Sequence, residues 1–252
     1  MSKAIYIATT EPNSGKSIVS LGLMQLLLGK TAKVGYFRPI IDDFEKNNID
    51  DHIDTILKHF EVDQKFEDSY AYTRSQVVQL KNLDKDDEII GRIINKYKAI
   101  EDRFDIVLVE GTDFSGEGAI IEWDINVLIA KNLGIPAVII ANAMGKTLQE
   151  LVGNVYMAYD SFKEKGVEVL LTVANKVQPG NVDLVVSSLR KKLPEKVLVG
   201  AIPLNPILGN PTVKEIAQKL SGKVLFGEDF INNQAGEFSV GAMQLRNYLT
   251  HL

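Results

Sequence analysis

Short apolar segments alternate with longer amphipathic segments along most of this 252-residue chain. The short segments are rich in Val and Ile and continuously hydrophobic, which is typical of parallel strands buried on both faces. The longer segments carry apolar residues at helical spacing. The alternation predicts an α/β fold with a doubly wound, mostly parallel sheet of about six or seven strands joined by right-handed crossovers. The expected strands are residues 4–9, 33–40, 104–111, 135–142, 167–175, 197–203 and 223–227, and the clearest expected helices are residues 16–28, 86–102, 120–133, 147–165, 182–193 and 212–220.

Two regions depart from this alternation. Residues 42–83 carry one expected helix, at about 50–60, between polar loops, and we expect them to form an insertion over the edge of the sheet. Residues 239–252 predict a helix whose apolar stripe has no later element to cover it. Such a helix either completes the core of its own domain or packs against another surface, and we expect a homo-oligomer.

Composition narrows the classes of function. The net charge is −5 and the pI is near 5.4, and Lys and Arg are scattered among acids, so we expect no nucleic-acid partner. The absence of cysteine excludes disulfides, thiolate metal sites and cysteine nucleophiles, and the three histidines are too dispersed for a metal cluster. No basic leader precedes an apolar segment, and no apolar run reaches the roughly 18 residues of a membrane span. We therefore expect a cytoplasmic protein with no membrane partner.

The segment IYIATTEPNSGKS joins the first expected strand to the first expected helix. It resembles a phosphate-binding loop of the form G-x-x-x-x-G-K-[ST], except that Thr10 stands at the first glycine. Backbone N–H groups and the helix dipole at Gly15 would hold an anion, Lys16 would reach the terminal phosphates, and the Ser17 hydroxyl could ligate Mg²⁺. The alternative is that the segment only caps a helix.

Two further polar residues follow expected strands. Glu110 ends the run DIVLVE, where a P-loop protein places a carboxylate that holds Mg²⁺ on the phosphates; the alternative is an ordinary acid where a strand meets solvent. Asn175 follows a later strand, where an amide can bind the edge of a purine; the alternative is an ordinary loop asparagine. A second GKT, at residues 145–147, is interpreted as structural, because Thr147 and Glu150 form a capping box.

These motifs resemble the dethiobiotin synthetase-like branch of P-loop proteins over residues 2–226. The loop of that family usually reads G-T-D-T-x-V-G-K-T, so Thr9 lies at its first glycine, while Thr10 keeps a hydroxyl and Glu11 an acid. YFRPI stands where the family has Y-K-P, and VEGTD where it has V-E-G-A-G-G. The resemblance implies binding of ATP with Mg²⁺. The implied phosphate ligands are Thr10, Asn13, Gly15, Lys16 and Ser17, the implied metal ligands are Ser17, Asp51 and Glu110, and the implied base-binding residue is Asn175.

The chain departs from that family on the substrate side. Arg38 replaces the lysine that the synthetase uses near its carbamate intermediate, and a guanidinium binds anions but cannot do the same proton chemistry. Asp113 and Phe114 replace the two glycines that let substrate approach the backbone. We therefore expect no synthetase activity, and Arg38 could instead contact a terminal phosphate or a small carboxylate effector.

The later sequence resembles the N-terminal region of long bacterial phosphate acetyltransferases. The resemblance lies in VGAIPLNPILGNPTVKEIAQKL and SVGAMQLRNYL. It implies a P-loop domain over residues 1–226, then a linker and the first helix of a DRTGG-like domain over residues 227–252. The implied function is a regulatory ATP/Mg²⁺-binding domain with no catalytic residues for acetyl transfer. Two alternatives stay open: a free-standing ATP-dependent carboxylate–amine ligase of the dethiobiotin type, and a nucleotide-free interaction domain.

Overall fold

The computed structural model describes residues 4–44, 49–112 and 119–236, and within 119–123 it describes the backbone alone. The chain divides into two compact units, Met1–Leu204 and Asn205–Leu252. The helix expected over residues 239–252 lies outside the described residues. The sequence boundary after residue 226, with a second domain following it, therefore stays a prediction.

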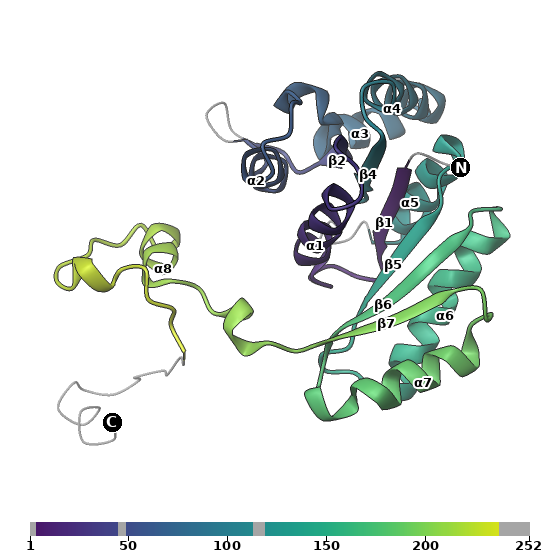
Figure 1. The fold of residues 1–252 in the computed structure, drawn as a ribbon. Coiled ribbons are helices and arrows are strands. Elements are labelled where there is room, and N and C mark those ends of the chain that lie inside the picture. Colours follow the sequence, from purple (N-terminus) through teal and green to yellow (C-terminus); the bar gives the residue numbers. More distant parts are fainter. Residues whose placement is uncertain (1–3, 45–48, 113–118, 237–252) are drawn as a thin grey trace. The chain divides into compact units, whose positions relative to one another are not determined.

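A seven-stranded parallel sheet forms the centre of the first unit, with strand order β3-β2-β4-β1-β5-β6-β7 (Figure 1). Chain order reverses beside β1, which is the doubly wound topology that the sequence predicted. The strands are β1 (Ala4–Thr9), β2 (Val34–Ile41), β3 (Tyr70–Thr73), β4 (Ile106–Glu110), β5 (Ala137–Asn142), β6 (Val169–Val177) and β7 (Leu198–Pro203).

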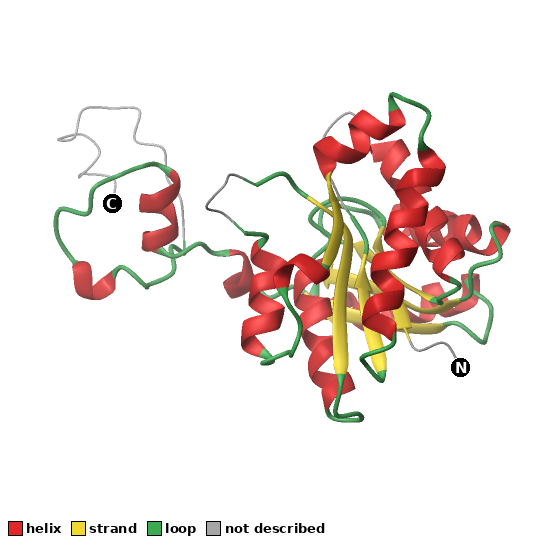
Figure 2. Ribbon diagram, turned by 90° about the horizontal axis from the view of Figure 1, so that it is seen from above, coloured by secondary structure: helices red, strands yellow, loops and turns green. Residues whose placement is uncertain are grey.

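Helices cover both faces of the sheet (Figure 2). One face packs against α4, α5, α6 and α7, and the other against α1 and α2. Successive residues of β1 show the alternation, because Tyr6 and Ala8 belong to the first hydrophobic cluster and Ile7 to the second. The helices are α1 (Lys16–Leu28), α2 (Asp51–His59), α3 (Arg74–Lys81), α4 (Asp86–Glu101), α5 (Ala119–Leu133), α6 (Leu148–Glu164) and α7 (Val182–Lys192), with short 3₁₀ turns at Phe66–Asp68 and Pro179–Asn181.

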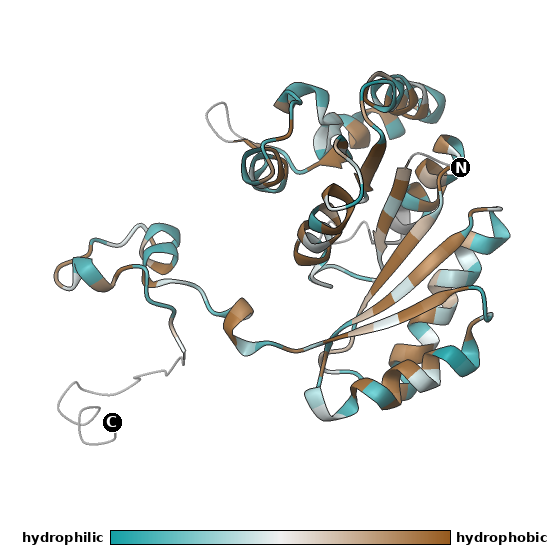
Figure 3. Ribbon diagram, viewed as in Figure 1, coloured by the Kyte–Doolittle hydropathy of each residue, from teal (hydrophilic) through white to brown (hydrophobic). Residues whose placement is uncertain are grey.

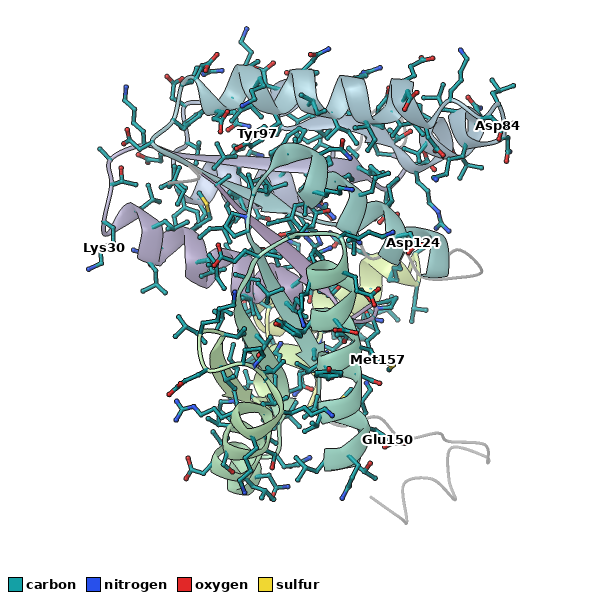
Figure 4. All side chains as sticks on the ribbon, turned by 90° about the vertical axis from the view of Figure 1, so that its right-hand side faces the viewer. Lys30, Asp84, Tyr97, Asp124, Glu150 and Met157 are labelled. Atoms are coloured by element: carbon teal, nitrogen blue, oxygen red, sulfur yellow. The ribbon has the colours of Figure 1, made fainter. Side chains whose placement is uncertain are left out.

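Hydropathy follows this layering. The strands are the most continuously apolar elements of the unit (Figure 3). Polar side chains such as Lys30, Asp124 and Glu150 lie on its exposed outer surface (Figure 4). Among the described residues, no helix combines the length and apolar composition needed to cross a bilayer.

The region over residues 42–83 extends the sheet as well as carrying α2. Its segment YAYT forms β3, which pairs with the outer edge of β2 and was not predicted. Gln64 fixes this edge, because its amide accepts a hydrogen bond from Tyr36 N at 3.1 Å and donates one to Tyr36 O at 2.6 Å. A four-residue strand carries too little alternation to be recognised in a polar region.

The second unit is small, and none of its described residues is buried. It contains α8 (Val213–Lys219), capped by Thr212 and Glu215, and 3₁₀ turns at Pro206–Gly209 and Glu228–Phe230. The strand expected over residues 223–227 is wrong, because these residues adopt no regular structure. Leu225 and Phe226 are 74% and 93% exposed, and the described residues of this unit form no sheet that could take up the apolar run.

Candidate functional site

The loop between β1 and α1 has the backbone that an anion site requires. Gly15 immediately precedes α1 with φ 82°, in the left-handed region, and a Cβ there would lie 2.2 Å from Asn175 Nδ2. No side chain caps α1, and no acidic residue lies in its first turn. The N-terminal N–H groups and the helix dipole face the loop, and Gly15 offers them no capping side chain, which suits an anion site better than a simple helix cap.

The carboxyl end of β6 supports this loop. Asn175 is buried, and its Nδ2 donates to the Ser14 carbonyl at 2.8 Å while its Oδ1 accepts from Lys176 N at 2.9 Å. Lys176 Nζ donates to the Asn13 carbonyl at 2.7 Å, and Asn13 itself has φ 59°. The Asn175 amide thus holds the loop in this conformation, and its role in binding a base stays a prediction.

The residue before the α6 cap also reaches the loop. Thr147 and Glu150 form the expected capping box, but Lys146 forms an ion pair with Glu11 and donates to the Asn142 carbonyl at 3.1 Å. Sequence reasoning assigned this GKT to the cap alone. The contact was missed because β5 and β1 are neighbours in the sheet, which places the end of β5 beside the loop.

Lys16 lies almost entirely inside the protein, with 2% of its side chain exposed. Its Nζ donates to the Gly111 carbonyl at 2.6 Å and lies 3.9 Å from Glu110 Oε1. The first residue of α1 therefore reaches the end of the neighbouring strand β4. This position brings the lysine of the motif and the predicted metal-binding carboxylate together.

Glu110 is fully buried, which contradicts the alternative of an acid at a strand–solvent boundary. Its Oε2 accepts hydrogen bonds from Ser20 Oγ at 2.5 Å and from Tyr36 OH at 2.8 Å. Its Oε1 lies 3.4 Å from Arg38 Nε and 3.2 Å from His52 Nδ1. Burial by itself would raise the pKa of Glu110, but the hydrogen bond with His52 and the nearby cations of the lysine and arginine hold this pKa well below its ordinary value. The carboxylate is therefore ionised at neutral pH.

Ser17 and Glu110 converge on the same side chain. Ser17 Oγ lies 3.0 Å from His52 Nδ1, and Glu110 Oε1 lies 3.2 Å from that nitrogen. The two oxygens fit Mg²⁺, which binds phosphates through one or two protein oxygens and completes its shell with water. Among the described residues, no group of three or more His, Cys, Asp or Glu could hold a metal ion.

The structure does not bring Asp51 to this cluster. Asp51 is exposed in the first turn of α2, and its part in metal binding stays a prediction. The preceding residue, Asp50, caps α2 through Ile53 N at 2.9 Å and accepts a hydrogen bond from Arg38 Nη1 at 2.5 Å. Asp50 and His52 were missed as site residues, because only the packing of α2 brings them to the carboxylate.

Two threonine hydroxyls at this edge of the sheet lack protein partners. The Oγ1 atoms of Thr10 and Thr112 are buried and make no hydrogen bond with any described residue, whereas Thr10 N donates to the Ile140 carbonyl at 2.9 Å. A buried hydroxyl without a partner is costly, and a ligand oxygen would satisfy it. The Thr10 hydroxyl fits its expected role at the phosphates. Asp113 and Phe114, on which the substrate-side expectation rests, lie outside the described residues.

Comparison with known proteins places these features in a family. A family model described as an AAA domain matches residues 3–212. A phosphate acetyltransferase of Nitratidesulfovibrio vulgaris is 43% identical over 176 residues, covering 70% of this chain and 25% of that protein. An ATP-dependent dethiobiotin synthetase of Bacillus velezensis is 23% identical over 187 residues, covering 70% of this chain and 75% of that protein. The MinD cell division protein of Aquifex aeolicus has a solved structure that is 14% identical, covers 92% of both chains and gives a TM-score of 0.46.

The match to phosphate acetyltransferase is partial, since this chain spans about a quarter of the length of the curated relatives that it matches first. The family model, in contrast, matches most of the chain, including all seven strands and the loop before α1. The chain therefore belongs to the AAA domain family, as a P-loop domain related to phosphate acetyltransferase.

Proposed function

We propose that this domain binds ATP with Mg²⁺ at the loop between β1 and α1. The observation that carries the proposal is the start of α1, where Lys16 follows the left-handed Gly15 and its ammonium lies 3.9 Å from the buried, ionised Glu110. Backbone N–H groups at such a helix start bind phosphate oxygens, and the helix dipole favours their negative charge.

Each residue of the loop has a separate part in this proposal. Gly15 has no side chain, so the backbone can approach the phosphates closely. Asn13 has a left-handed backbone conformation that turns the loop. Thr10 offers a hydroxyl without a protein partner. Lys16 exchanges its bond to the Gly111 carbonyl for a phosphate oxygen, which is a charge-assisted and therefore stronger acceptor.

Ser17 and Glu110 would hold Mg²⁺ on the phosphates. The ion, when bound, neutralises charge on the phosphate oxygens. The family resemblance implies a part for Asp51 in metal binding, and its exposed position next to the Arg38-bound Asp50 is compatible with a contact through water. Contact between Arg38 and an effector would require it to change partners, because Arg38 is 5% exposed and bound to Asp50.

We infer that nucleotide binding here regulates a phosphate acetyltransferase. Support comes from the 43% identity to such an enzyme over a region that makes up 25% of its length. Acetyl transfer would then belong to another part of the relatives. Synthetase activity is not favoured, since Arg38, in place of the family lysine, lies buried between Asp50 and Glu110 and has no freedom to carry protons.

The binding experiment is a calorimetric titration of the chain with Mg-ATP, Mg-ADP and Mg-GTP. Lys16→Gln removes the ammonium and should weaken ATP binding by roughly 1.5–3 kcal/mol, or about 10- to 150-fold. Lys30→Gln, at an exposed lysine beyond the end of the same helix, is the matched control and should leave affinity unchanged. Circular dichroism checks that both variants fold.

The absence of binding heat and thermal shift at millimolar Mg-ATP would favour a nucleotide-free interaction domain. An assay with diaminopelargonic acid, bicarbonate and ATP tests the synthetase alternative. Turnover at about 0.1 per second or faster would favour that alternative, since ordinary enzymes run at about 1–1000 per second.

A further inference from the structure

The His52 ring lies close to both oxygens that we assign to the metal. Its Nδ1 lies 3.0 Å from Ser17 Oγ and 3.2 Å from Glu110 Oε1, and its Nε2 lies 3.4 Å from Ser17 Oγ. The side chain is 38% exposed, so the ring borders solvent on one side and the buried carboxylate on the other. A ring at this position has direct access to an ion that binds there.

The two separations from His52 Nδ1 are compatible with ligands that share one ion. At metal–ligand distances of about 2.1 Å, adjacent ligands of an octahedral ion lie about 3.0 Å apart. The distances from His52 Nδ1 to Ser17 Oγ and to Glu110 Oε1 fall near this value. Ser17 Oγ, Glu110 Oε1 and His52 Nδ1 would therefore be the groups that hold the ion, because the ring nitrogen already lies close to each oxygen.

The fold holds this ring in place. His52 lies in the first turn of α2, which Asp50 caps and joins to Arg38. The same helix buries Ile53 and Ile56 against the sheet. Two cations also face the carboxylate, Arg38 Nε at 3.4 Å and the Lys16 ammonium at 3.9 Å. His52 is therefore carried by a packed helix, and its position does not depend on a loop.

We propose that His52 ligates the nucleotide-bound divalent cation through Nδ1 and makes this site prefer Mn²⁺ to Mg²⁺. Mg²⁺ is a hard ion that selects oxygen, whereas imidazole nitrogen suits first-row transition metals. Carboxylate and water ligands suit both Mg²⁺ and Mn²⁺, so a change in the preference between them would come from this histidine. The proposal rests on the proposed nucleotide site.

The experiment first measures nucleotide binding and then identifies the ligands of the bound metal ion. A fluorescent ATP analogue is titrated first without metal and then with Mg²⁺ or Mn²⁺. If no nucleotide binds under any condition, the proposed function fails, and with it this proposal. If nucleotide binds, electron spin-echo spectroscopy of the Mn²⁺–ATP complex decides the ligand, since imidazole nitrogen coupled to Mn²⁺ gives a characteristic modulation.

Isotope labelling and paired variants assign that nitrogen. Labelling only histidine with ¹⁵N should change the modulation, which separates the imidazole from the nitrogens of adenine. His52→Gln should abolish it and lower the ratio of Mn²⁺ to Mg²⁺ affinity by about tenfold or more. His59→Gln, on the same helix but with its ring against Phe60, is the matched control and should retain both.

The assignment of the nitrogen to His52 can be tested even if the His52→Gln variant does not fold. Should that variant fail to fold, the labelled wild-type chain together with His59→Gln and His251→Gln identifies His52 by elimination. Nucleotide and Mn²⁺ that bind without histidine coupling overturn the proposal. An unchanged ion preference in a folded His52→Gln variant also overturns it.

Discussion

Replacing Gly15 by alanine probes the contact between the phosphate loop and the end of β6. The new Cβ would lie 2.2 Å from Asn175 Nδ2, far inside contact distance, at a residue with φ 82°. The left-handed backbone costs a non-glycine residue roughly 1–2 kcal/mol. The asparagine must also move and give up its 2.8 Å hydrogen bond to the Ser14 carbonyl, which leaves buried groups unpaired at about 1–3 kcal/mol.

The expected loss of unfolding free energy in Gly15→Ala is therefore about 3 kcal/mol, or a fall in melting temperature of about 6–12 °C for a domain of this size. Urea unfolding followed by circular dichroism measures it. Gly145→Ala is the matched control. Gly145 has φ +76° but nothing within 4 Å of an added Cβ, so this variant reports the backbone cost alone, about 1–2 kcal/mol.

A double-mutant cycle tests the assigned cause. Asn175→Ala removes the amide that the new Cβ would strike, so Gly15→Ala should cost about 1 kcal/mol less in that background than in the wild type. Equal costs in the two backgrounds would refute the contact as the cause. Equal losses in Gly15→Ala and Gly145→Ala would refute it independently, because only the backbone cost would then remain.

Two further predictions concern buried polar groups. The folded protein lowers the pKa of Glu110 from the ordinary value of 4.5. The ionised carboxylate therefore stabilises the folded state at pH values above 4.5, and this stabilisation is progressively lost as the pH falls below 4.5. Glu110→Gln should therefore be destabilised by about 3–5 kcal/mol at pH 7, and by less at pH 3, in urea titrations across this range; a pH-independent difference would contradict the assigned ionisation. Gln64→Ala removes the amide bonded to Tyr36 N and O at the edge of β2, and should cost about 2–3 kcal/mol and speed hydrogen exchange at Tyr36 N; unchanged exchange would show that β3 protects this edge without the amide.

Much of the fold could be predicted from the sequence, because each buried parallel strand corresponds to a short continuous run of apolar residues. The predicted strand at residues 4–9 has the bounds of β1, and the helix at 16–28 those of α1. The prediction failed where local pattern was weak or misleading. YAYT is short but pairs with β2, while the more apolar KVLFG lies in a unit whose described residues form no sheet. Burial by distant residues decided both cases, and no local window contains that information.

The sequence by itself determined that Gly15, Lys16 and Ser17 open a helix directly after a strand, and that Glu110 ends another strand, because these properties depend on neighbours in the chain. Only the tertiary structure decided what surrounds that carboxylate. The strand order placed β4 beside β1. The packing of α2 on the sheet face that also carries α1 brought His52 to Glu110, 58 residues away in the chain. Asp51, its neighbour in the sequence, stayed exposed. Successive residues of a helix point about 100° apart, so the register of α2 against the sheet selects the side chain that reaches the site.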